Sequence, residues 1–158
     1  MKIITKSILI LSFLLTISCG FKVIDRSNTN NFKIKEINTD GNNRVNYKIK
    51  NYLLNNTLQK DNKNVLSIDI KTKIKKKIKE KNIKNEITKY EVTLNTNVDI
   101  YLIEKNRKSN FNLSVSGDYL VHSNYSSTIS NEKNLIDNLI EKLGKNILKE
   151  ITKTINDL

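Results

Sequence analysis

Three stretches of the chain alternate between apolar and polar residues, and this period of two constrains the fold more than any other feature. Apolar residues occupy even positions in the first stretch: Leu66, Ile68, Ile70, Ile74 and Ile78. Even positions are again apolar from Tyr90 to Leu102, and odd positions are apolar from Phe111 to Tyr119. Because neighbouring side chains of a strand point to opposite faces, each stretch predicts a half-buried strand.

The first stretch also permits a helix, because three of its isoleucines are spaced four residues apart. The β-branched residues between Val65 and Ile74 favour a strand. Its continuation beyond Lys76 stays open. We expect polar loops over Glu80–Glu86 and Glu104–Asn110.

A further strand is expected near the start of the domain, where Phe32, Ile34 and Ile37 are apolar. The run Asp40-Gly41-Asn42-Asn43 is typical of a turn and ends this strand. From Arg44 to about Lys60 the apolar residues recur every three or four positions, which predicts an amphipathic helix capped by Asn43.

A second helix is predicted at the C-terminus. Its apolar stripe is broad enough to lie flat on a sheet and contains Leu135, Leu139, Leu143, Ile147 and Ile151. Ser130 is the expected N-cap, and Gly144 within the stripe indicates close packing. The element order β-α-β-β-β-α predicts a single α+β domain over residues 32–158: a two-layer sandwich with two helices packed on a four-stranded, mostly antiparallel sheet.

The N-terminus has the pattern of a bacterial export signal. Lys2 and Lys6 precede a mainly apolar run, Ile8 to Ile17, which spans only about 15 Å as a helix and is too short for a membrane anchor. A small residue, Ser18, stands directly before the only cysteine, Cys19. This resembles the lipobox of a lipoprotein signal, although Thr16 replaces the usual branched aliphatic residue.

This pattern predicts a signal peptide over residues 1–18, a lipidated Cys19, and a tether over residues 19–31. The alternatives are an ordinary signal peptide or a buried strand with a cysteine there by chance. Several acyl chains, such as palmitate, on Cys19 would hold the protein on a membrane, at about 0.8 kcal/mol per buried methylene.

The formal charge of +12 is a weaker clue than it first suggests. Lys, Asn and Ile make up 73 of the 158 residues, while Ala and Pro are absent, as expected of a very AT-rich genome. Only three arginines are present, and arginine supplies the bidentate contacts that base recognition favours. We therefore expect no nucleic-acid partner; a secreted nucleic-acid-binding protein is the less favoured alternative.

The sequence contains no constellation for catalysis, cofactor binding or metal binding. One cysteine and one histidine, His122, cannot make a Cys/His metal site, and the serines lie outside any Gly-x-Ser-x-Gly elbow. Four glycines form no phosphate-binding loop. We expect Tyr119 and Tyr125 to be packing residues, and we do not expect an enzyme.

The whole layout resembles the LPS-assembly lipoprotein (LptE) family. The resemblance rests on Cys19-Gly20-Phe21 after the signal, the strand order, and Ser123-Asn124-Tyr125-Ser126 before a long final helix. One departure is Lys22-Val23-Ile24, where related members often have Pro-Leu-Tyr.

The resemblance implies a lipoprotein on the periplasmic side of the outer membrane. Such a protein plugs an LptD-type barrel, helps the barrel to assemble, and binds lipopolysaccharide on its way to the cell surface. Gly20, in place of the aspartate that retains lipoproteins on the inner membrane, agrees with this location. The alternative is a generic periplasm-facing lipoprotein scaffold for another envelope complex.

A row of lysines is the candidate lipopolysaccharide-binding site. Lys71, Lys73, Lys75 and Lys77, followed by Lys79, occupy the odd positions of the first alternating stretch. On a strand they would project from one face at about 6.6 Å spacing, where they could bind lipid A phosphates. The competing interpretation is a solvated face enriched in lysine by codon bias, which also prevents edge pairing.

Overall fold

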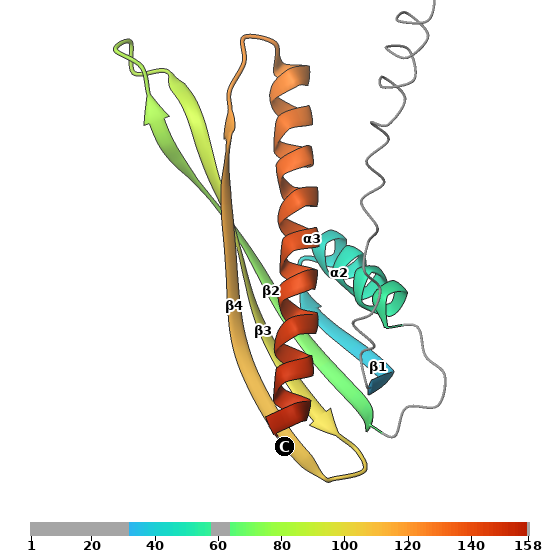
Figure 1. Cartoon of the computed structure of the whole chain (residues 1–158). Coiled ribbons are helices and arrows are strands. Elements are labelled where there is room, and N and C mark those ends of the chain that lie inside the picture. Colours follow the sequence, from blue (N-terminus) through green and yellow to red (C-terminus); the bar gives the residue numbers. More distant parts are fainter. Residues whose placement is uncertain (1–31, 58–63, 158) are drawn as a thin grey trace, which may run out of the picture.

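The alternating stretches pair into one sheet, as the computed structural model of residues 32–57 and 64–157 shows (Figure 1). The elements are β1 (Phe32–Gly41), α2 (Asn43–Asn56), β2 (Asn64–Lys81), β3 (Ile87–Leu102), β4 (Arg107–Leu120) and α3 (Tyr125–Asp157). The predicted α+β class and the order β-α-β-β-β-α are confirmed.

The sheet has the strand order β1-β2-β3-β4. β2, β3 and β4 are antiparallel neighbours, whereas β1 runs parallel to β2 because α2 carries the chain back between them. The predicted turn after β1 is present. Gly41 has a φ of +102°, and a Cβ atom there would lie 2.1 Å from the carbonyl oxygen of Thr72, so both the backbone and the space require glycine.

Both helices cover the same face of the sheet, and the core lies between these two layers (Figure 1). The even residues of β2 and β3 point into it, so Ile68, Ile70 and Leu94 are completely buried. α3 packs on β4 and also contacts α2. Gly144 permits this second contact, because a Cβ atom would lie 2.3 Å from the ring of Tyr52 on α2.

Several element boundaries differ from the predictions. α2 is capped by Asn42 instead of Asn43, through a 3.0 Å bond from the Val45 N–H to the Asn42 side chain. α3 begins at Tyr125, so Ser130 lies inside the helix instead of capping it. Asn124 takes that role, since its side chain accepts the Ser126 N–H at 2.9 Å.

The two predicted loops are shorter than expected, because strand pairing continues through polar residues. β2 extends to Lys81 and β3 starts at Ile87, leaving a turn in which Asn82 accepts the N–H groups of Lys84 and Glu86. β4 starts at Arg107, opposite Leu102. The signal peptide, Cys19 and the tether lie outside the described residues.

Candidate functional site

The lysine row lies on the face of the sheet that no helix covers. Lys71, Lys73 and Lys75 are exposed there, opposite Asn97, Asn95 and Thr93 of β3. None of these three lysines forms an ion pair within the described part of the chain. They are therefore free to bind an anion.

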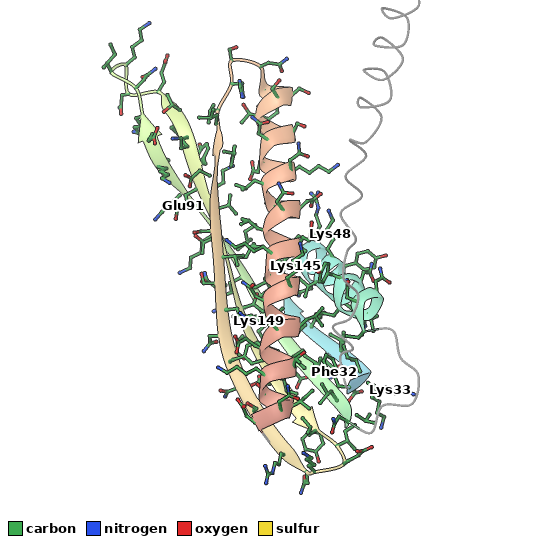
Figure 2. All side chains as sticks on the ribbon, viewed as in Figure 1. Phe32, Lys33, Lys48, Glu91, Lys145 and Lys149 are labelled. Atoms are coloured by element: carbon green, nitrogen blue, oxygen red, sulfur yellow. The ribbon has the colours of Figure 1, made fainter. Side chains whose placement is uncertain are left out.

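The other two lysines of the row are already paired. Lys77 bonds to Glu91 on β3 at 3.0 Å, and Figure 2 shows Glu91 projecting from the sheet on the side away from α3. A register shift after Ile78 follows, and Lys79 pairs with Asp118 on β4. The predicted row thus divides into three unpaired lysines and two neutralised ones.

The uncovered face also changes in charge along its length. Lys71 and Lys73 border a shallow hollow that residues of β3 and β4 also line, among them Asn95, Asn97, Asn112 and Ser114. A second hollow lies toward the opposite end, and its charged lining residues are Asp69, Asp99 and Lys108. An anionic ligand would therefore favour the hollow at Lys71 and Lys73.

Toward its turn, the β2–β3 hairpin splays away from β4 and α3, as Figure 1 shows. Ile83 at its turn is fully exposed, and Lys81 and Lys84 flank it. More large apolar side chains are exposed at this end of the molecule: Ile78, Leu120, Tyr125 and Ile129. We call these four residues together with Ile83 the hairpin end. The prediction that Tyr125 is a packing residue is wrong, because its side chain is exposed, whereas Tyr119 is buried as predicted.

A polar cluster closes the core below the hairpin end. Lys76 lies on the helix-facing side of β2, bonds to Glu132 of α3 at 2.8 Å, and lies 4.4 Å from the ring centre of Tyr90. The Tyr119 hydroxyl donates to the same carboxylate at 2.9 Å, and its ring stacks on Tyr90. These four residues tie the first turns of α3 to the sheet.

The cluster shifts the pKa of each charged member toward the ion pair. Burial opposes the charge of Lys76, but its hydrogen bonds to Glu132 and Tyr119 outweigh burial and raise the pKa of Lys76. Burial likewise opposes the charge of Glu132, and the bonds from Lys76 and Tyr119 outweigh it and lower the pKa of Glu132. The pair is therefore charged at neutral pH.

Neither a metal centre nor a membrane-spanning helix is found within the described residues. No three metal-binding side chains gather there, and no helix is long and apolar enough to cross a bilayer. His122 is exposed, and its main-chain N–H bonds to Thr128. The candidate surfaces are therefore the three unpaired lysines and the hairpin end.

The comparisons with known proteins relate the chain to others by structure alone. No family model matches the sequence, and no curated protein sequence matches it. The rare lipoprotein B from Shewanella oneidensis superposes with a TM-score of 0.59 at 14% identity, covering 77% of this chain and 97% of that one. The uncharacterized lipoprotein B from Nitrosomonas europaea gives 0.56 at 10% identity, covering 82% and 90%. The chain has the fold of these bacterial lipoproteins.

Sequence reasoning identified the lysine row but missed the hairpin end. The alternation shows that Ile78 and Lys77 point to opposite faces, yet it carries no information on where α3 stops covering the sheet. The one available signal was Ile83, a large apolar residue inside a segment that reads as a polar loop.

Proposed function

We propose that this protein is an outer-membrane lipoprotein, anchored through Cys19, that plugs and helps to assemble an LptD-type barrel and binds lipopolysaccharide. In this proposal it is a binding and assembly protein and not an enzyme. The observation that carries the proposal is the fold shared with bacterial lipoproteins along most of the chain. The lone cysteine behind an export-type signal supports it independently.

The surfaces of the domain suit a ligand that combines phosphates with acyl chains, as lipid A does. Lys71, Lys73 and Lys75 supply unpaired ammonium groups for phosphate. The hairpin end supplies exposed apolar side chains, with Lys81 and Lys84 beside its outermost residue. Grouped exposed apolar residues are typical of sites that bind a lipid or a protein.

The lysines can be tested with a variant that removes charge and little else. Replacing Lys71, Lys73 and Lys75 by Gln should weaken binding of purified lipopolysaccharide by at least about tenfold, since each lysine near an anionic surface contributes about 1 kcal/mol. The matched control replaces Lys142, Lys149 and Lys153 by Gln, three exposed lysines of α3 that form no ion pair with another described residue. Equal binding by both triple variants would dismiss the lysine site.

A second pair of variants tests the apolar side chains of the hairpin end without changing the charge of the protein. Ile83→Ser removes the outermost apolar side chain and should weaken lipopolysaccharide binding, with a smaller loss for lipid A analogues that lack acyl chains. Leu54→Ser on α2 is the control, because Leu54 is also exposed but lies away from the hairpin. If both variants bind like the parent protein, apolar contact at the hairpin end is not part of the site.

A further inference from the structure

β4 is an edge strand, and no strand of the described residues pairs with its outer side. The N–H of Val121 bonds to the carbonyl of Thr88, so odd residues at this end of β4 direct their main-chain groups toward β3. The register between β3 and β4 continues without a shift from Lys89↔Leu120 to Leu102↔Arg107. The even residues from Lys108 to Asp118 therefore direct their N–H and C=O groups away from the sheet. None of these outward groups bonds to any described residue.

The opposite edge of the sheet is protected against pairing, and β4 is not. β1 has ten residues and a register shift between Ile34 and Glu36, and it carries charged side chains such as Lys33 and Lys35. Bulges and charges of this kind block the addition of another strand. β4 has fourteen residues, no register shift, and only Asn and Ser at its even positions between Lys108 and Asp118.

The outward side of β4 is complementary to itself. If Leu113 is placed opposite Leu113 of a second, antiparallel copy, then Lys108 faces Asp118 of that copy. Asn110 then faces Ser116, and Asn112 faces Ser114, so small polar side chains meet small polar side chains. Each of these pairs joins even residues, which are the ones with free main-chain groups. The same contacts occur twice, as a two-fold axis requires.

The helix-facing side of β4 is complementary to itself as well. Phe111 and Leu113 are only partly buried at this edge, and in the same register Phe111 would pack against Val115 of the second copy. α3 packs on the face of β4, where Leu135 and Leu139 lie against Gly117. Figure 1 shows no helix along the outer edge of β4.

We propose that β4 is a self-association edge, through which two copies pair antiparallel about Leu113 and join their sheets. This inference does not depend on the proposed function. Strand addition of this type uses main-chain hydrogen bonds for affinity and alternate side chains for register.

The proposal is tested on residues 32–158, which contain the core cluster of the described residues and no cysteine. Sedimentation equilibrium should show a dimer. Ser114→Pro should return it to a monomer, because proline removes an outward N–H and leaves the bonds to β3 intact. A protein that stays monomeric up to about millimolar concentration, or a Ser114→Pro variant that still forms the dimer, would overturn the proposal.

A cross-linking test checks the register without relying on proline. Leu113→Cys should form a disulfide-linked dimer under mild oxidation, because facing residues of a non-hydrogen-bonded pair have Cα atoms about 4.5 Å apart. Phe111→Cys is the control, since in this register the two Phe111 positions are separated by four residues, about 13 Å along the strand. Equal cross-linking of both variants, or no cross-linking of Leu113→Cys, would contradict the proposed register.

Discussion

The two halves of the β2–β3 hairpin share one sequence pattern but have different surroundings. In the half beneath the helices, Ile70 is 1% exposed, whereas in the projecting half Ile78 is 47% exposed, although both point to the same face. Alternation therefore determines which face a side chain joins, and the reach of α3 determines whether that face is covered. The covered half stabilises the fold, and the projecting half leaves large apolar side chains such as Ile78 and Ile83 exposed.

The largest loss of stability is expected for a substitution in the half of the hairpin that lies beneath the helices. Ile70→Ala removes a fully buried side chain and should reduce the free energy of unfolding by about 2–4 kcal/mol. Ile78→Ala should cost less than about 1 kcal/mol, because water already reaches that side chain. Urea unfolding followed by circular dichroism measures both values. Similar losses for the two variants would show that the projecting half is also covered.

A second stability effect is expected where α2 and α3 touch. Gly144→Ala places a methyl group against the ring of Tyr52 and should destabilise the protein by about 1–3 kcal/mol, despite the better helix propensity of alanine. Gly144→Ala should cost less in a Tyr52→Ala background than in the parent protein, because the ring that meets the new methyl group is then gone. Asn138→Ala, on the exposed side of α3, is the control and should be neutral or slightly stabilising.

The Lys76–Glu132 pair at the boundary of the two halves should make stability depend on pH. The pKa of Glu132 is lowered by folding, so its contribution is complete above the ordinary value of 4.5 and is lost as pH falls through the folded value. The pKa of Lys76 is raised, so its contribution is complete below 10.5 and is lost as pH rises through the folded value.

Glu132→Gln should therefore lower stability at pH 7 by about 1 kcal/mol, since the pair is partly exposed, and should have a smaller effect at pH 3. Thermal unfolding of the variant and the parent protein at both pH values measures this difference. A loss of equal size at pH 3 and pH 7 would mean that packing, and not charge, accounts for the contribution of Glu132.

The smallest change in stability is expected for Lys77, which pairs with Glu91 on the uncovered face of the sheet. Lys77→Gln breaks the bond to Glu91, yet Lys77 is largely exposed, so stability should change by less than about 0.5 kcal/mol. Denaturant midpoints of the variant and the parent protein provide the comparison. A larger loss would show that the projecting hairpin depends on its ion pairs for its shape.

Most of the fold could be predicted because apolar residues recur with a clear period along each strand and helix. Ile68 and Ile70 indicate the buried face of β2, and the stripe from Leu135 to Ile151 indicates the buried face of α3. The boundaries were harder, because Arg107 to Asn110 are polar and become a strand only through pairing with β3. The start of α3 was misplaced because Ser130 and Asn124 are both good capping residues, and local chemistry does not choose between them.

The candidate site could be predicted only in part, because it depends on contacts between distant residues. The lysine row is visible in the sequence, but the neutralisation of Lys79 requires Asp118, which lies two strands away in the sheet. Ile78 is exposed although it belongs to the apolar face of β2, because the hairpin separates from α3 toward its turn (Figure 1). The pattern of residues along the chain does not show which distant residues lie close together in the fold.

Affinity capture from detergent-solubilised envelopes of the native bacterium tests most directly whether this protein is a lipoprotein that plugs an outer-membrane barrel. A tagged protein with Cys19 intact should bring down an outer-membrane barrel in about equimolar amount, and lipopolysaccharide should copurify with it. A variant with Cys19→Ala should lose the lipid anchor and recover less barrel. Capture of the intact, lipidated protein without any outer-membrane barrel would contradict the account.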